Sequence, residues 1–429
     1  MNSSGLSLNS RMVAVDVLNA VLNKKQRLEA SFRRSSAGKD LCTQERAFSR
    51  QLIFTTLRRL GQIDDLISKS LLNPEKKISR KTQNLIRIGV CQLIFLRTRD
   101  YAAISTTVDL AKRRKFKAPA SLINAVLRRV QRDSEIVLKS QDKEQLNTPS
   151  WLWRSWKKLY GEDETRAIAQ AHMVEPLLDL SFKGCPGRDL LKLNGVILPW
   201  GTVRCNVSGE VANLPGFKEG HWWVQDSASR IAVKLLGNVA DKTVVDMCAA
   251  PGGKTLFLAS LGAKVIAIDI SKERLTNLNK NLSRLNLKAE VIEADSIYWR
   301  PNRKVDYVLL DAPCSSTGII RRHPDVAHLK KAPIIKNLAL TQSKLLESAS
   351  KILNTSGTIL FCTCSLQYEE GFGQVKTFLE KNPDFKLDKI SGNEVFSREN
   401  YSGVFRSLPS DFSGWGGLSG FFAARLKRE

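Results

Sequence analysis

The spacing of apolar residues predicts that the first third of the chain is helical throughout. Over residues 1–140, apolar side chains recur every three or four positions, which is the period of one face of an α-helix. Val13, Val17 and Val21 form one such row. The alternation of apolar and polar residues that is typical of a half-buried strand is absent from this region. We therefore expect an all-α bundle over residues 1–140.

A polar segment and a group of turn residues follow this bundle. Residues 141–147 are polar, and we expect them to form a linker. Gly184, Pro186 and Gly187 are typical of turns between short elements. The region 150–235 is therefore expected to form a small α/β subdomain of short helices and strands.

From residue 236 onward, short apolar runs alternate with helical segments. The runs that we assign to strands are residues 243–247, 264–268, 290–292, 305–310 and 358–362. Strands that alternate with helices build a parallel, doubly wound sheet. We thus expect a multidomain protein, in which an all-α N-terminal bundle and the small subdomain precede a Rossmann-like α/β domain over residues 236–429.

Composition adds a functional constraint, because basic residues strongly outnumber acidic ones. The 429 residues include 67 Lys and Arg against 42 Asp and Glu, which gives a net charge of +25. Such an excess favours a polyanionic partner that is bound through its phosphates. General basicity without a binding role is the alternative. Hydrophobic residues make up 42% of the chain, which argues against wholesale disorder, so we expect a folded protein that binds nucleic acid.

The cysteines and histidines bear on metal binding and on cellular location. Eight cysteines and four histidines show no spacing typical of a zinc site or a disulfide framework. We therefore expect no metal, and free thiols in a reducing compartment. The first residues lack the apolar region of a signal peptide, and no apolar run is long enough to cross a bilayer. We expect a cytoplasmic protein without a membrane partner, and a monomer.

The segment Asp246–Lys254 joins the first strand of the last domain to a helix and is rich in glycine. Glycines at this turn let the backbone approach a ligand closely. Gly253, Lys254 and Thr255 fit the end of a phosphate-binding P-loop, but Cys248 stands where that motif requires its first glycine. The G-x-G-x-x-G dinucleotide fingerprint does not fit either. A ligand loop of another kind is therefore expected, with a simple tight turn as the alternative.

Two acidic residues follow the next two predicted strands. Asp269 ends the second strand, where a carboxylate can accept hydrogen bonds from the ribose hydroxyls of an adenosine ligand. Asp295 follows the third strand, where it could meet the adenine. Either residue could instead cap a helix. Because the carboxyl ends of parallel strands share one edge of the sheet, and α/β sheets bind ligands there, we expect an adenosine-containing ligand.

The two remaining strands run into segments that carry an acid and two cysteines. One strand leads into DAPCSSTG, which contains Asp311 and Cys314, and the other leads into FCTCS, which contains Cys364. These three side chains should meet at the same edge of the sheet. A single cysteine at a strand end is more often an inert buried residue. Two cysteines beside an acid and an adenosine pocket suggest covalent catalysis.

One reaction needs this set of groups, namely methylation of cytosine at carbon 5. That carbon is a poor nucleophile until a thiolate adds to carbon 6 and makes carbon 5 enamine-like. An acid near ring nitrogen 3 can donate a hydrogen bond as charge builds there. A base must then remove the proton from carbon 5 so that the thiol can leave. Spacing alone does not say which cysteine attacks, and Cys314 in its Pro-Cys context is a candidate, as in DNA cytosine methyltransferases.

At these motifs the chain resembles a known family. CAAPGGKT, DAPCSSTG and TCS are similar to segments of the RsmB/Sun family of RNA 5-methylcytosine methyltransferases, as are VQDSAS at 224–229 and GFFAARL at 420–426. The resemblance covers residues 150–429, and the helical region in front resembles the NusB-type RNA-binding domain. It implies an S-adenosyl-L-methionine-dependent enzyme that forms 5-methylcytosine in 16S (small-subunit) ribosomal RNA.

The resemblance also implies a role for each matching residue. Cys364 would be the nucleophile, Cys314 would assist release, and Asp311 would touch both the cytosine and the methyl donor. The residues implied to bind S-adenosyl-L-methionine are Cys248, Ala249, Ala250, Pro251, Gly252, Gly253, Lys254, Asp269, Asp295 and Asp311. Two positions depart from the family pattern: Gly371 replaces an asparagine, and Ser419 replaces an acid.

Other functions remain open on the sequence alone. A transfer RNA substrate, a DNA substrate and a catalytically silent RNA-binding or assembly protein are the alternatives. A P-loop nucleotide hydrolase is a further one, which the missing first glycine disfavours.

Overall fold

The computed structural model describes residues 8–429 except 37–40, 74, 76, 114, 208, 392–393 and 395–402. The chain divides into two compact units. The helical unit comprises residues up to Val174 together with 320–331. The α/β unit, which carries the predicted site residues and is called the catalytic unit for that reason, comprises residues 175–319 and 332–429.

The helical unit is built as the apolar period predicts. Its helices are α1 (Leu8–Leu18), α2 (Leu28–Ser36), α3 (Thr43–Arg58), α4 (Leu60–Ser70), α5 (Arg80–Val90), α6 (Asp100–Lys112), α7 (Ala120–Lys139), α8 (Lys143–Asn147), α9 (Ser150–Tyr160), α10 (Glu162–His172) and α15 (Val326–Leu329), with π-helical turns at Asn19–Asn23 and Cys91–Phe95. Val13, Val17 and Val21 are fully buried in one core. The prediction of an all-α bundle is confirmed.

The structure differs from the expected organisation just after α7. Residues 141–147 are not a plain linker, because they contain α8, whose first turn is capped by Asp142. The polar side chains here make internal hydrogen bonds: Gln62 Nε2 donates to Gln141 Oε1 (2.9 Å), and Asn147 Nδ2 donates to Gln62 Oε1 (2.9 Å). The following helices α9 and α10 also belong to the helical unit and not to the α/β subdomain. The prediction of a linker at 141–147 failed because it rested on the polarity of these residues alone.

A segment from the catalytic half of the sequence completes the helical unit. Residues 320–331 leave the catalytic unit directly after its DAPCSSTG motif and return to it at Ala332. Within the helical unit, Leu28 N donates to Asp325 Oδ2 (3.0 Å) and Arg58 Nη2 donates to the carbonyl of Arg321 (2.9 Å). No feature of the sequence indicated this insertion.

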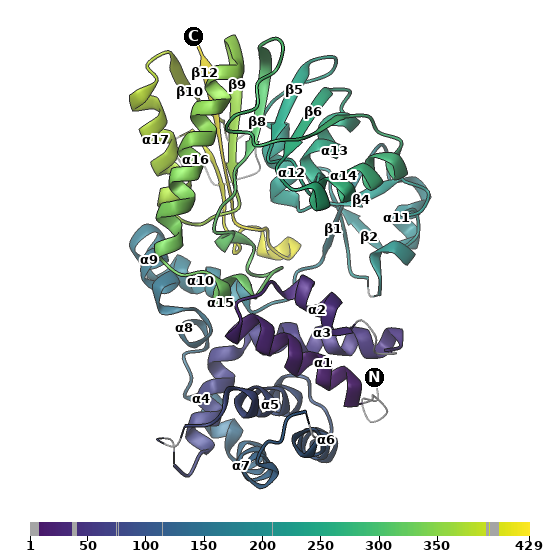
Figure 1. Cartoon of the computed structure of the whole chain (residues 1–429), viewed down its shortest axis with the longest axis vertical. Helices are drawn as coiled ribbons and strands as arrows, with labels where there is room; N and C mark the ends of the chain where they lie inside the picture. The colour runs from purple at the N-terminus through teal and green to yellow at the C-terminus, as the bar shows by residue number, and fades with distance from the viewer. Residues whose placement is uncertain are drawn as a thin grey trace. The chain divides into compact units, whose positions relative to one another are not determined.

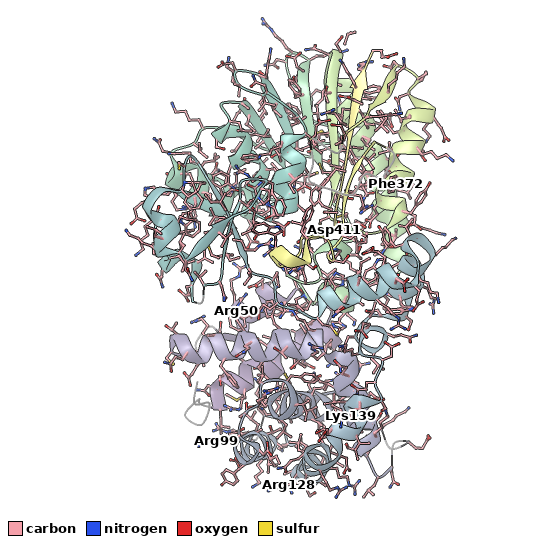
Figure 2. The ribbon with its side chains drawn as sticks, turned by 180° about the vertical axis from the view of Figure 1, so that it is seen from behind. Arg50, Arg99, Arg128, Lys139, Phe372 and Asp411 are labelled. Carbon is pink, nitrogen blue, oxygen red and sulfur yellow. The ribbon has the colours of Figure 1, made fainter. Side chains whose placement is uncertain are left out.

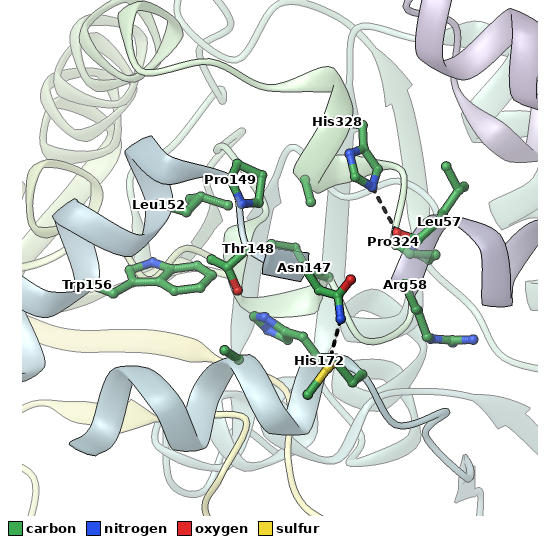
Figure 3. A pocket seen from close by; sticks show the side chains of 14 residues that line it. Leu57, Arg58, Asn147, Thr148, Pro149, Leu152, Trp156, His172, Pro324 and His328 are labelled. Carbon is green, nitrogen blue, oxygen red and sulfur yellow. Dashed lines mark hydrogen bonds between the residues drawn. The ribbon is translucent and has the colours of Figure 1, made fainter. Parts of the chain in front are cut away.

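The segment also closes a small cavity in the helical unit (Figure 3). The cavity of about 20 Å³ has room for roughly one water molecule. His328 faces it and contacts the carbonyl of Leu57 through Nε2 (3.0 Å), while Asn147 Nδ2 donates to Met173 Sδ (3.1 Å). His172 also lines the cavity, and burial lowers its pKa to about 3. This histidine is therefore neutral.

The catalytic unit begins with a small antiparallel sheet of strand order β2-β3-β1-β4. Its elements are β1 (Leu178–Phe182), α11 (Gly187–Lys192), β2 (Gly195–Ile197), β3 (Val203–Cys205) and β4 (Trp222–Val224). Arg204 and Asp179 form a buried bidentate ion pair across β3 and β1, with an Nε to Oδ1 distance of 2.6 Å. A small α/β subdomain was expected in this part of the chain.

The large sheet has the order β10-β12-β9-β8-β5-β6-β7, with β11 paired to β12 (Figure 1). Its strands are β5 (Thr243–Met247), β6 (Lys264–Asp269), β7 (Glu290–Glu293), β8 (Val305–Asp311), β9 (Leu353–Thr363), β10 (Phe385–Asp388), β11 (Phe405–Ser407) and β12 (Phe421–Arg428). Strands β5 to β9 are parallel, which confirms the prediction. The last strand, β12, pairs antiparallel with β9, β10 and β11, which the sequence did not indicate.

Helices cover both faces of this sheet (Figure 1). They are α12 (Ser227–Lys234), α13 (Gly253–Ser260), α14 (Lys272–Leu285), α16 (Pro333–Ile352) and α17 (Phe372–Lys381). Val244 packs in the core with α12, α13 and α14, whereas its neighbour Val245 packs in the core with α16 and α17. This alternation along β5 is that of a strand buried on both faces.

Candidate active site

The parallel strands bring the predicted chemical groups to one edge of the sheet. β5, β6, β8 and β9 run in the same direction, so their carboxyl ends lie together. Backbone hydrogen bonds connect the loops beyond these ends: Ala249 N donates to Ile268 O (2.9 Å), and Gly318 N donates to Cys364 O (2.9 Å). The site is therefore built from loops that a rigid sheet holds in register.

The glycine-rich loop turns sharply between β5 and α13. Gly252 has a φ of 108°, and a Cβ there would lie 2.3 Å from Cδ1 of Leu278. Only glycine fits this turn without moving Leu278, because the backbone passes so close to α14. Ala250 N donates to Asp269 Oδ2 (3.0 Å), which ties the loop to the end of β6.

Asp269 and Asp295 both make local backbone hydrogen bonds. Asp269 is buried and accepts from Ser271 N (2.9 Å) as well as from Ala250 N. Asp295 accepts from Ile297 N (2.9 Å) through Oδ1. These contacts organise the turns after β6 and β7, so each carboxylate has a structural task. Their roles toward an adenosine ligand stay predictions.

Lys254 and Asp311 form an ion pair between the loop after β5 and the end of β8. The distance from Lys254 Nζ to Asp311 Oδ2 is 2.6 Å. Burial is the largest single effect and by itself would lower the pKa of Lys254. The charge of Asp311, the hydrogen bond to it, and Cys362 and Asp246 together outweigh burial and raise the pKa of this lysine above its ordinary value. Asp246 in β5 is fully buried, which raises its pKa to about 7, and it accepts a hydrogen bond from Thr255 Oγ1 (2.6 Å).

The two cysteines meet directly. Cys314 Sγ lies 3.4 Å from Cys364 Sγ, although the residues are 50 positions apart. The hydrogen bond from Cys314 lowers the pKa of Cys364 below its ordinary value of 9.0, against the opposing effects of burial and of the Asp311 charge. The same hydrogen bond, together with burial, raises the pKa of Cys314 well above that value. These opposite pKa shifts favour Cys314 as the donor of the hydrogen bond and Cys364 as the sulfur that ionises first.

A cavity of about 400 Å³ opens beside the glycine-rich loop. Lys254 and Asp311 lie at its wall together with Gln225, Asn281 and Arg284. The last three were missed by sequence reasoning. Gln225 lies within the VQDSAS segment, which offered a signal, whereas Asn281 and Arg284 look like ordinary polar residues of an exposed helix.

The two departures from the family pattern have local explanations. Ser419 Oγ donates to Asp226 Oδ2 (2.5 Å), a position where an acid would face another carboxylate. At Gly371, a Cβ would lie 2.9 Å from Nη2 of Arg406. Both residues therefore suit their surroundings in this chain.

Among the described residues, no group of three or more histidines, cysteines and acids is arranged to hold a metal ion. None of the helices in the described ranges has the length and apolar character needed to cross a membrane.

Comparisons with known proteins agree with the two-part layout. The NusB family matches residues 8–132, and the family described as 16S rRNA methyltransferase RsmB/F matches residues 233–427. Ribosomal RNA small subunit methyltransferase B of Shewanella oneidensis is 34% identical over 400 residues, covering 89% of this chain and 92% of the relative. The protein of the same name from Cronobacter sakazakii is 34% identical over 441 aligned positions, covering 98% and 99%.

Solved structures share the fold. The structure titled "Crystal Structure of PH0851" has a TM-score of 0.79 at 22% identity and covers 99% of both chains. NSun6 from Pyrococcus horikoshii, solved with SFG, has a TM-score of 0.57 at 21% identity and covers 65% of this chain and 98% of its own.

Proposed function

Because this chain belongs to the ribosomal RNA small subunit methyltransferase B (RsmB/Sun) family, we propose that it forms 5-methylcytosine in 16S ribosomal RNA through a covalent adduct of Cys364. The family makes the chain an S-adenosyl-L-methionine-dependent rRNA methyltransferase. The observation that supports the finer proposal is the 3.4 Å contact in which the Cys314 thiol stabilises the Cys364 thiolate.

The loop after β5 fits the methyl donor. Its backbone passes within contact of α14 at Gly252, and a cavity of about 400 Å³ lies beside it. We assign the residues Cys248 to Lys254, Asp269, Asp295 and Asp311 to holding S-adenosyl-L-methionine, which supplies an activated methyl group. No metal is needed for this chemistry.

The reaction starts at Cys364. Its thiolate forms a bond to carbon 6 of cytosine, and the electrons of the carbon 5–carbon 6 double bond move through carbon 4 toward ring nitrogen 3. Carbon 5 is then the nucleophile that takes the methyl group, and the donor would leave as S-adenosyl-L-homocysteine. Asp311 is paired with Lys254 and is a carboxylate in this state. It can therefore accept a hydrogen bond from the 4-amino group of cytosine. The Lys254 ammonium, rather than a protonated Asp311, offsets the negative charge that the ring gains.

In the release step, the bond between the sulfur of Cys364 and carbon 6 breaks. Once a base has removed the proton from carbon 5, the double bond re-forms and the sulfur of Cys364 leaves as a thiolate. Cys314 stands 3.4 Å from that sulfur and donates its S–H to the leaving thiolate. A group that stabilises a leaving anion in a site of low polarity accelerates its departure.

Adduct trapping tests the proposal. The protein is incubated with S-adenosyl-L-methionine and a 16S rRNA fragment, and protein–RNA adducts that survive denaturation are measured. We expect the adduct to accumulate in Cys314→Ala and to be absent from Cys364→Ala. The reverse pattern would exchange the two roles. Absence of both adduct and methylated product from every variant would favour the silent RNA-binding alternative.

Substrate choice is tested by product analysis. Equal amounts of 16S rRNA fragments, transfer RNA and duplex DNA are offered, and 5-methylcytosine is measured by mass spectrometry. We expect the product only in the 16S fragments. Methylation of transfer RNA or DNA at a comparable rate would overturn the ribosomal assignment.

A further inference from the structure

Glu370 carries a carboxylate that is completely buried in the catalytic unit and lies outside the reacting groups. It ends the short 3₁₀ helix Tyr368–Glu370, which follows the loop of Cys364. Burying a carboxylate is costly unless hydrogen bonds replace its lost hydration. Four donors do so here. Ser315 N (2.8 Å) and Gln342 Nε2 (3.1 Å) donate to Oε1, and the hydroxyls of Ser365 (2.6 Å) and Ser315 donate to Oε2.

The positions of these donors in the sequence indicate what Glu370 does. Ser315 directly follows Cys314, and Ser365 directly follows Cys364. A single carboxylate thus joins the two loops that carry the cysteines. The serine hydroxyls also lie 3.1 Å from each other. Each loop is fixed one residue away from its sulfur.

Glu370 is itself held in place by its surroundings. Thr363 Oγ1, at the end of β9, donates to the Glu370 carbonyl (3.0 Å). The Ser365 carbonyl accepts from Nη1 of the buried Arg406 (2.5 Å). The Cys364 loop is therefore held by two hydrogen bonds of Ser365, whose side chain binds Glu370 and whose carbonyl binds Arg406.

The carboxylate also has an electrostatic effect on one of the two sulfurs. The pKa of Cys314 is raised by its hydrogen bond to Cys364, by burial, by the charge of Cys364 and then by that of Glu370. The main effects on the pKa of Cys364 come from Cys314, burial, Asp311, Ser316 and Lys254. The negative charge thus favours Cys314 as the protonated partner.

We propose that Glu370 is a positioning residue that holds the loops of Cys314 and Cys364 at the separation in which one sulfur donates its hydrogen bond to the other. This inference rests on the proposed function for its catalytic meaning, but the positioning itself is a property of the free protein. Glu370 positions the two loops through its hydrogen bonds with Ser315 and Ser365, and its charge acts in addition on Cys314.

Substitution of Glu370 by Gln provides the test, because it keeps the shape of the side chain and replaces one acceptor oxygen by a donor that faces other donors. Positioning and simple charge removal predict different changes in the pH at which Cys364 is half reactive toward iodoacetamide. If the loops loosen, Cys364 loses the hydrogen bond from Cys314 and this midpoint rises. If only a nearby negative charge is removed, the midpoint falls or stays.

We expect the midpoint of Cys364 alkylation to rise in Glu370→Gln, and kcat to fall on the order of 100-fold with little change in KM for S-adenosyl-L-methionine. Glu370→Asp should restore part of kcat. The matched control is Glu369→Gln, since Glu369 is the exposed neighbour and should behave as wild type. A Glu370→Gln protein with the kcat and alkylation midpoint of Glu369→Gln would overturn the proposal.

Two further measurements keep the outcomes distinct. If Glu370→Gln does not fold, as judged by circular dichroism, Ser315→Ala decides, because it removes one hydroxyl donor and keeps the backbone N–H. An upward shift of its alkylation midpoint supports the proposal, and an unchanged one overturns it. If the wild type makes no 5-methylcytosine but the midpoint still rises in Glu370→Gln, the proposed function fails while the positioning role stands.

Discussion

Lys254 Nζ lies 2.6 Å from Asp311 Oδ2, and this ion pair joins the start of α13 to the end of β8 at the edge where the two cysteines meet. The charge of Asp311 raises the pKa of Cys364, and the charge of Lys254 lowers it. The two charges therefore oppose each other at Cys364, and the hydrogen bond from Cys314 is the largest cause of the lowered pKa of Cys364.

Removing Cys314 should make Cys364 a weaker acid. Because the hydrogen bond from Cys314 is the largest cause of the lowered pKa of Cys364, the alkylation midpoint of Cys364 should rise in Cys314→Ala. Peptide-resolved mass spectrometry after iodoacetamide treatment measures this, with the exposed Cys185 as an internal reference. A midpoint that stays or falls would contradict the assignment of Cys314 as donor.

Breaking the ion pair should destabilise the catalytic unit. Lys254→Met leaves the Asp311 carboxylate unpaired at a partly buried position, which should cost about 3 kcal/mol of unfolding free energy. Urea unfolding measures the change. Lys351→Met is the matched control, because the pair of Lys351 and Glu347 is exposed and should contribute less than about 1 kcal/mol. Equal losses in the two variants would show that burial does not matter here.

Asp246 should make stability depend on pH. Burial raises the pKa of Asp246 from its ordinary value of 3.8 to about 7 in the folded protein. Between these two pH values, the folded state therefore keeps a proton on Asp246 that the unfolded state has lost. The contribution of Asp246 is therefore most favourable below pH 4 and is lost as the pH rises to about 7. Asp246→Asn should gain stability relative to wild type over that range, on the order of 2–4 kcal/mol.

Thermal unfolding of both proteins from pH 4 to pH 8 checks this prediction. Asn keeps an oxygen that can accept the hydrogen bond of Thr255, so the comparison isolates the charge. A difference between the two unfolding midpoints that does not change with pH would show that Asp246 is ionised throughout.

The helical unit should bind RNA through exposed basic residues of α6 and α7. Arg128 projects outward from α7 (Figure 2), and Lys112 and Arg113 are exposed at the end of α6. Lys115 and Arg129 contribute less, because they contact Asp16 and the carbonyl of Ser70. Arg128→Glu should weaken RNA binding and reduce the slope of log affinity against log salt by about 1.

The same charge change elsewhere on the helix serves as its control. Lys139 lies at the end of α7 and pairs with Glu135 (Figure 2). Fluorescence anisotropy at several salt concentrations compares Lys139→Glu with Arg128→Glu. If both variants lose affinity equally, net charge and not a localised surface governs binding, and if neither does, these residues are only a solvated face.

Local patterns were sufficient to predict the all-α bundle, the parallel strands and the edge of the sheet that carries the site. The apolar run at 243–247 is β5 to the residue, and Asp311 does end β8. These predictions succeeded because the period of burial is set by the geometry of each element alone. The direction of parallel strands then placed Asp311, Cys314 and Cys364 at one edge without knowledge of any contact.

Contacts between distant residues decided the rest, and no local pattern encodes them. The pKa of Cys364 is lowered because a loop 50 residues away brings Cys314 Sγ within 3.4 Å of its sulfur. Glu370 looked like part of an ordinary acidic pair until Ser315 and Ser365 were found to share its carboxylate. The insertion of residues 320–331 into the helical unit likewise depends on long-range packing. A pKa or a buried hydrogen bond belongs to a pair of groups in space, so only the tertiary structure could assign it.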